Sequence, residues 1–135
     1  MTEPRVRRLL PPLCVAAVPA AALLCVRAVD PNEPGHYPAC PLLRWTGLYC
    51  PGCGGLRGLY ALAHGDLAGA LRANALAVAA YAAFAVLWAV WLVRAARRGG
   101  GMPLPARAAA WWALGGLVLL FTVVRNLPFG PALAP

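Results

Sequence analysis

The chain has 135 residues, of which 61% are hydrophobic and 12% charged, and its mean hydropathy is +0.67. Soluble domains are about 45–50% apolar and about 25% charged, so this composition argues against an ordinary soluble fold, and the same hydrophobicity argues against disorder. The net charge of +8 comes from arginines that flank apolar runs, a distribution typical of membrane proteins that makes nucleic acid an unexpected partner.

Three uncharged apolar runs follow one another along the chain, at residues 9–26, 75–93 and 108–124. Crossing ~30 Å of hydrocarbon takes about 20 residues, and a backbone in lipid must satisfy its own hydrogen bonds. The runs therefore predict transmembrane helices at approximately 9–29, 74–94 and 107–125. The first run could also be a cleaved signal peptide, but its length exceeds the usual hydrophobic core of about 7–15 residues, which favours a retained helix.

These elements predict an all-α membrane protein that forms a single membrane domain over residues 1–135. Arg5, Arg7 and Arg8 precede the first helix, and four more arginines lie between the second and third, at positions 94, 97, 98 and 107. The remaining five arginines lie on the other side. The excess of positive charge predicts a cytoplasmic N-terminus and an external C-terminus. Residues 30–73 are then external, and residues 95–106 form a cytoplasmic linker.

The external segment begins as a loop rich in proline and cysteine, and from Leu56 onward apolar residues recur at helical spacing. We expect an amphipathic helix that lies in the outer interface or folds back against the bundle. Gly65 suits a left-handed position at a helix C-terminus, and Asp66 can cap the turn that follows. Asn74 can cap the second transmembrane helix in the same way. Capping is therefore the expected role of Asp66 and Asn74.

Five cysteines are present, and Cys14 and Cys25 fall inside the first helix, where we expect small buried hydrophobes. The other three, Cys40, Cys50 and Cys53, lie in the external segment. The first interpretation of these three is structural, because disulfides persist outside the cytoplasm. Cys40 could bridge to Cys50 or to Cys53, and the sequence does not choose between the pairings.

The second interpretation is a metal site, because Cys50 and Cys53 have the spacing of a zinc knuckle. A structural zinc site needs four ligands, which Cys40 and His36 could complete, with His64 as another candidate. The third interpretation is a thiol redox pair, with Cys50 attacking and Cys53 resolving near the cationic Arg57. We rank the structural role first, metal second and thiol exchange third. No cofactor is expected apart from this candidate zinc.

Three motifs carry a family resemblance: Cys50-Pro51-Gly52-Cys53-Gly54-Gly55-Leu56-Arg57, His64-Gly65-Asp66-Leu67 and Asn74-Ala75-Leu76. With Asp30-Pro31-Asn32-Glu33 and Arg125-Asn126-Leu127-Pro128-Phe129, they resemble the DUF2752 family from about Val29 to the end of the chain. The resemblance implies a bacterial integral membrane protein of unknown function, with Arg57, Gly65, Asp66 and Asn74 as motif polar residues. Leu56 and Ala75 depart from the family, which often has threonine and proline there.

Catalytic chemistry is scarce in this sequence, which contains no serine and only two histidines. We name no catalytic residue, and we expect a non-enzymatic accessory protein or subunit with a cysteine-stabilised external segment. Its expected partners are the lipid bilayer and either other membrane proteins or a second copy of the chain. One further hypothesis places a polar cluster at the outer mouth of the bundle, formed by Arg57, Asp66, Arg72, Asn74 and Arg125.

Overall fold

The computed structural model describes residues 5–97, 101–105 and 107–128 of the chain. These residues form five helices and no strand: α1 (Arg5–Ala28), α2 (Pro41–Thr46), α3 (Gly55–Ala63), α4 (Leu67–Arg97) and α5 (Ala108–Arg125). The helices α1, α4 and α5 are long and apolar enough to cross a membrane. The predicted all-α fold with three such helices is therefore confirmed.

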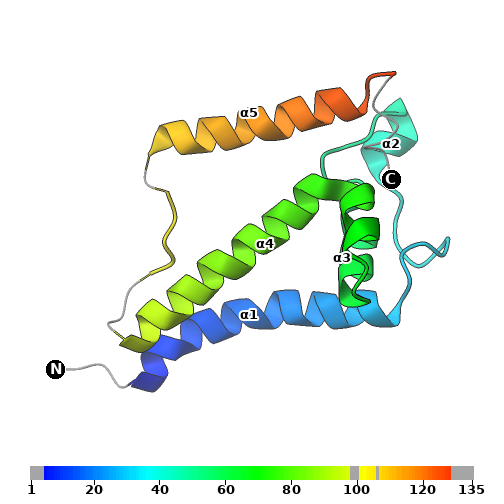
Figure 1. The fold of residues 1–135 in the computed structure, drawn as a ribbon. Coiled ribbons are helices and arrows are strands. Elements are labelled where there is room, and N and C mark those ends of the chain that lie inside the picture. The colour runs from blue at the N-terminus through cyan, green and yellow to red at the C-terminus, as the bar shows by residue number, and fades with distance from the viewer. Residues whose placement is uncertain (1–4, 98–100, 106, 129–135) are drawn as a thin grey trace.

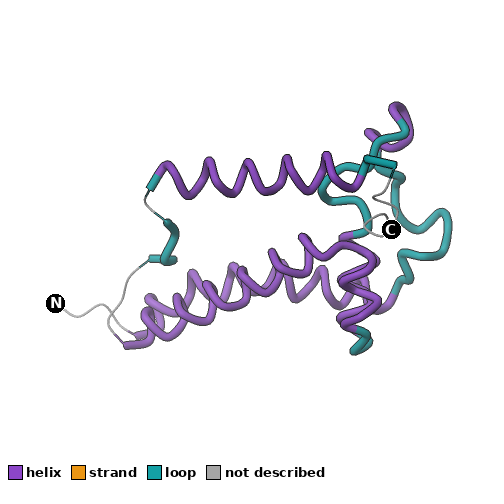
Figure 2. Tube along the Cα trace, turned by 45° about the horizontal axis from the view of Figure 1, so that its top comes forward, coloured by secondary structure: helices purple, strands orange, loops and turns teal. Residues whose placement is uncertain are grey.

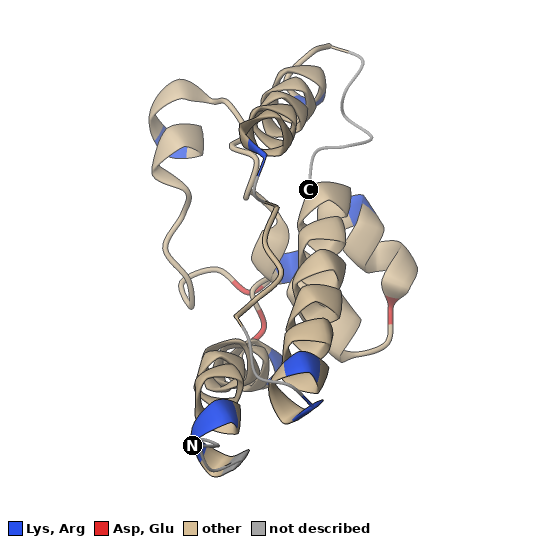
Figure 3. Cartoon of the chain, turned by 90° about the vertical axis from the view of Figure 1, so that its left-hand side faces the viewer, with Lys and Arg blue, Asp and Glu red and all other residues tan. Residues whose placement is uncertain are grey.

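The three long helices alternate in direction, because α1 and α5 run one way and α4 runs back between them (Figure 1). One end of the molecule, which we call the arginine end, holds the start of α1, the end of α4 and the start of α5. Basic residues gather there, as Figure 3 shows, including Arg94 and Arg97 in the last turn of α4. Arg98 lies outside the described residues. The opposite end, the cysteine end, holds α2, α3 and the end of α5.

At the cysteine end, α3 and the start of α4 form a tight helical hairpin. Gly65 connects them with a positive φ of 81°, and Asp66 accepts a hydrogen bond of 2.8 Å from the Gly69 N–H, the cap that the sequence predicted. Gly58 allows the close approach of the two helices, since a Cβ there would lie 3.3 Å from the Ala70 carbonyl oxygen. Because α3 packs against both α4 and α1, the amphipathic segment folds back against the bundle.

The helix α4 bends at Asn74, whose backbone is extended at φ −167° and ψ 95°. The Oδ1 atom of Asn74 accepts a hydrogen bond of 2.9 Å from the Ala77 N–H, so this residue caps the second apolar span as predicted. As a whole, α4 begins at Leu67, before the predicted start of the second span at about residue 74. The two starts differ because the last turns of the amphipathic segment continue into α4 through the bend at Asn74.

Packing between the long helices is uneven. α1 lies against α4, where the Trp88 indole N–H donates a 2.8 Å hydrogen bond to the Pro12 carbonyl, but α5 stands apart from both along its length (Figure 2). Cys14 and Cys25 are exposed on α1. The expectation that they are small buried hydrophobes was wrong, because α1 meets its neighbours along other positions.

The short helix α2 was not predicted. Pro41 occupies its first turn, where the missing N–H costs nothing, and Gly47 ends it with φ 73° and an N–H bonded to the Leu43 carbonyl. These two residues are the sequence signal that could have revealed it. The helix matters because Cys40 is its N-cap residue.

Candidate metal centre

Three cysteines from two separate segments meet at the cysteine end. Cys40 immediately precedes α2, and Cys50 and Cys53 flank a turn that leads into α3. Their Sγ atoms all lie within 4.8 Å of one another. The Sγ of Cys50 is central, at 3.4 Å from that of Cys40 and 2.9 Å from that of Cys53. The fold thus brings together Cys40, Cys50 and Cys53, the three cysteines that the sequence singled out.

The turn itself is closed by local hydrogen bonds. The Cys53 N–H donates to the Cys50 carbonyl at 3.1 Å, and the Cys50 N–H donates to the Cys53 sulfur at 3.3 Å. Gly54 follows with a positive φ of 81°, a conformation that favours glycine and lets α3 begin directly after the second cysteine. Glycine at position 54 is therefore needed for the shape of the turn.

Side chains from α4 and from the end of α5 anchor the backbone of this turn. The Asn74 side-chain amide donates to the carbonyls of Pro51 and Cys53 at 2.8 and 2.9 Å, and the Tyr81 hydroxyl donates to the Gly55 carbonyl at 3.2 Å. Asn126, just after α5, accepts from the Tyr49 N–H and donates to its carbonyl. These contacts fix the turn against two of the long helices.

Arg125 is the most unusual member of this group, because its side chain is only 2% exposed. It donates to the carbonyls of Cys50 and Cys53 at 3.0 and 3.2 Å, and its guanidinium lies over the rings of Tyr49 and Phe121. Its Nε and Nη2 atoms are buried without a hydrogen-bond partner in the described part of the chain. A buried charge is costly unless an opposite charge compensates it. Thiolates at the neighbouring cysteines would supply that negative charge.

The thiols differ in their environment. The nearby backbone N–H of Leu43 and the thiol of Cys50 lower the pKa of Cys40 from 9.0 to about 7. Burial raises the pKa of Cys53 to about 12, in keeping with its exposed fraction of 8%. In the metal-free protein, Cys40 therefore ionises more readily than Cys53.

The spacing of the sulfurs fits a tetrahedral metal site. Sulfurs at about 2.3 Å from a zinc ion are about 3.8 Å apart. The Cys40–Cys50 separation of 3.4 Å is near this value, whereas the Cys50–Cys53 separation of 2.9 Å is shorter. Thiolate ligands select zinc, copper(I) and iron–sulfur clusters over hard cations such as Mg²⁺. Cys40, Cys50 and Cys53 would hold such an ion, and a small shift of Cys53 away from Cys50 would complete the arrangement.

The two histidines do not join the cysteines. Among the described residues, the group of potential ligands contains only the three cysteines. The Nδ1 of His36 lies 3.4 Å from a carboxylate oxygen of Glu33, and the Nδ1 of His64 lies 2.9 Å from the Tyr60 carbonyl oxygen. The predicted four-ligand set of His36 with three cysteines is therefore not assembled in this structure, because the proline-rich loop directs His36 toward Glu33.

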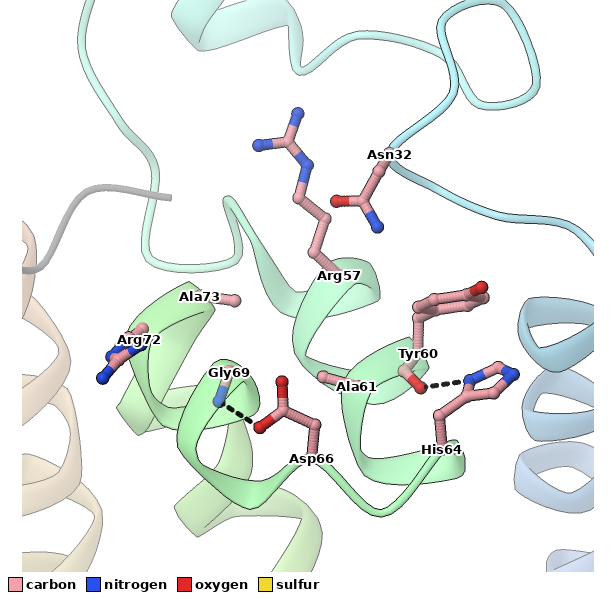
Figure 4. Close-up of a pocket in the computed structure, with 9 residues that line it drawn as sticks. All are labelled: Asn32, Arg57, Tyr60, Ala61, His64, Asp66, Gly69, Arg72 and Ala73. Carbon is pink, nitrogen blue, oxygen red and sulfur yellow. Dashed lines mark hydrogen bonds between the residues drawn. The ribbon is translucent and has the colours of Figure 1, made fainter.

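The hypothetical polar cluster divides into two groups. Asn74 and Arg125 belong to the cysteine turn, whereas Arg57, Asp66 and Arg72 line a hollow of about 470 Å³ between α3 and the start of α4 (Figure 4). The Arg57 side chain projects from α3 toward the loop that carries Asn32, away from Asp66. No ion pair joins Asp66 to an arginine within the described ranges, so capping is the role that the structure gives to this residue.

Sequence reasoning missed Tyr49 and Tyr81 as members of the site, and it assigned Arg125 and Asn126 only to the general neighbourhood. No local sequence pattern distinguishes Tyr81 from the other aromatic residues of its apolar run. The Arg125-Asn126 pair did carry a signal, since two polar residues end an otherwise apolar helix. The sequence does not show what this pair contacts, because Asn126 bonds to Tyr49, which lies 77 positions earlier in the chain.

The fold and the site together define an all-helical protein with three potential membrane-spanning helices and a triple-cysteine centre at one end. Residues 40–88 match the model of a family described as "Protein of unknown function (DUF2752)". The match confirms the family resemblance, over a shorter range than the predicted one from Val29 onward, and it includes all three cysteines and Asn74. No curated protein and no solved structure matches this chain.

Proposed function

We propose that this protein is a small, non-enzymatic multi-pass membrane component whose three cysteines bind a metal ion, with zinc as the first candidate. The observation that carries the proposal is the convergence of three sulfurs within 4.8 Å from two separate segments. A single disulfide would use two of these sulfurs and leave the third without a role. A metal ion uses all three, and it ties α2 to α3 through one centre.

The charge of the site supports the same proposal. Three thiolates around a divalent cation carry a net charge of −1, and Arg125 places a buried positive charge on the carbonyls of two of the ligand residues. Without an anionic cluster, this guanidinium would be buried with no compensating charge. A metal–thiolate centre thus accounts for the two features of the site that a plain structural turn leaves unexplained.

The proposed location follows from the distribution of arginine. We propose that the arginine end faces the cytoplasm and that the cysteine end, with the C-terminus, faces outward. A cysteine-free variant with one new cysteine at position 37 tests this orientation in intact cells. Labelling of that cysteine by a membrane-impermeant maleimide is expected, and protection from the reagent until the cells are lysed would overturn the orientation.

The metal proposal is tested on full-length protein purified in detergent without chelator. We expect about one bound metal ion per chain by elemental analysis and native mass spectrometry, and its loss in Cys40→Ser and in Cys53→Ser. The matched controls Cys14→Ser and Cys25→Ser change cysteines on α1 and are expected to keep the metal. Metal-free protein that carries a Cys40–Cys50 or Cys40–Cys53 disulfide would overturn the proposal and establish the structural disulfide in its place.

A thiol redox function is the second candidate, favoured by the 2.9 Å separation between the Cys50 and Cys53 sulfurs. It predicts a Cys50–Cys53 disulfide that forms and breaks reversibly, with no dependence on metal. In reduced, chelator-treated protein at pH 8, Cys40 should be alkylated faster than Cys53, since its pKa is about 7 and that of Cys53 is about 12. Protection of all three thiols on adding zinc would favour the metal site over the redox pair.

A further inference from the structure

The cysteine cluster borders a cavity of about 600 Å³. One wall is the loop of residues 31–40, and the other is formed by the cysteine turn and the first residues of α3. Cys40 and Cys53 both line this cavity, together with Arg57. Cavities of about 300–1,000 Å³ are typical of sites for small organic molecules. The volume of this cavity is therefore much larger than the space that one metal-bound water molecule would occupy.

A metal ion at the three cysteines keeps one coordination position that the protein does not fill. Within the part of the chain that the structure describes, no fourth cysteine, histidine or carboxylate belongs to the ligand group. Tetrahedral sites with three protein ligands take their fourth ligand from solution. Because the other three ligands are thiolates, the bound ion is one that prefers sulfur. The cavity that Cys40 and Cys53 line would give a ligand from solution access to that position.

Arg57 gives the cavity a charge preference. Its side chain projects toward the loop wall (Figure 4), and no carboxylate in the described ranges forms an ion pair with it. Glu33, which also lines the cavity, lies beside His36 instead. A guanidinium binds a carboxylate in a planar, two-pronged arrangement. A ligand that enters this cavity therefore meets a sulfur-preferring metal on one side and a carboxylate-binding cation on the other.

We propose that this cavity binds a low-molecular-weight thiol that carries a carboxylate, with its sulfur as the fourth metal ligand and its carboxylate on Arg57. This inference rests on the proposed metal site. In the binding step the metal–sulfur bond replaces a metal–water bond, and the thiol proton goes to solvent. No electron is transferred, so the step needs neither an oxidant nor a reductant.

The test uses full-length protein in detergent, loaded with Co²⁺ as a spectroscopic substitute for zinc. Two probes of similar size are titrated, 3-mercaptopropionate and the neutral 2-mercaptoethanol, while the d–d and thiolate charge-transfer bands are followed. We expect 3-mercaptopropionate to change the spectrum at about threefold lower concentration, the effect of one ion pair with an exposed arginine. In Arg57→Gln the two thiols should become equivalent. Arg72→Gln, which changes an arginine that lines only the neighbouring hollow, should keep the preference.

The outcomes separate the two proposals. Absence of thiolate charge-transfer bands on adding Co²⁺ overturns the metal site itself. Co²⁺ bands that neither thiol alters, or that both alter equally in the unmodified protein, leave the metal site standing and overturn the cavity proposal. Removal of Co²⁺ from the protein by 3-mercaptopropionate, measured by elemental analysis after desalting, also overturns it, because the proposed complex retains the metal.

Discussion

The long apolar helices and the cysteine turn are held in place by different means. In the apolar windows of α1, α4 and α5, 11%, 6% and 6% of residues are buried inside the protein, so most side chains face outward. At the cysteine turn, side chains from α4 and the end of α5 bind carbonyl groups of a few consecutive residues. Moving apolar surface from lipid into a protein interface releases little free energy, whereas hydrogen bonds between segments still stabilise the fold. The comparison indicates that the turn sets the position of α5 relative to α4, whereas α1 is placed by its contacts with α3 and α4.

Removing Arg125 is expected to have the largest effect on this arrangement. Arg125→Met keeps the apolar stem but removes one of the two hydrogen-bond donors to each of the Cys50 and Cys53 carbonyls, and it removes the positive charge from the site. We expect the free energy of unfolding in detergent to fall by about 3 kcal/mol, and the affinity for zinc to weaken. Arg125→Lys is the matched control, since it keeps the charge and loses the two-pronged geometry. Equal zinc affinity in the Met and Lys variants would show that the charge plays no part.

The second prediction separates the two roles of Asn74. Asn74→Ala removes the cap of the second span and both donors to the turn, for an expected loss of about 2 kcal/mol in the free energy of unfolding. Asn74→Asp keeps an oxygen to accept from the Ala77 N–H but turns a carboxylate toward two carbonyl groups. We expect the Asp variant to be at least as unstable as the Ala variant at pH 7. A stable Asp variant would mean that capping is the whole contribution.

The third prediction concerns Asp66, whose contact is local and exposed. Asp66→Ala should cost about 1 kcal/mol, the usual value of a helix cap, measured by thermal unfolding in detergent. Asp66→Asn should be close to the unmodified protein because its oxygen can still accept from the Gly69 N–H. If the Asn variant loses as much as the Ala variant, the carboxylate charge itself is needed, and pairing with an arginine would replace capping as its role.

The smallest effect is expected within a span. Leu119 on α5 has an exposed fraction of 66%, so Leu119→Ala should change the free energy of unfolding by less than about 0.5 kcal/mol. A loss well above this value would show that α5 packs against another protein in the membrane. Crosslinking of the purified chain would then identify whether that protein is a second copy.

The spans and their caps were predictable because each depends on residues close together in the sequence. An uncharged run of sufficient length predicts a helix in lipid, and Gly65 with Asp66 predicts the end of one helix and the start of the next. The same local rules applied to Pro41 and Gly47 would have located α2. What the sequence shows only as an arginine at a helix end is, in the structure, a buried donor to a turn 75 residues earlier.

The cysteine cluster shows where spacing stops being informative. The sequence grouped Cys40, Cys50 and Cys53 because all three lie in one polar segment between two apolar runs, and the structure places their sulfurs within 4.8 Å of one another. His36 was added because its spacing suited a fourth ligand, but spacing does not fix the direction of a loop that contains several prolines. The separation between the cysteine turn and the hollow near Asp66 also depends on the bend at Asn74, which no periodic pattern reveals.

The position of Arg125 and Asn126 near the end of the chain has a consequence for biosynthesis. The ribosome makes the three cysteines long before it makes the two side chains that anchor their turn. Until α5 and the residue that follows it have been made and have packed against the turn, the carbonyls of Tyr49 and Cys50 lack these donors. The anchoring of the cysteine turn is therefore complete only after α5 has been made, and a chain truncated before α5 would expose an unanchored turn to quality-control proteases.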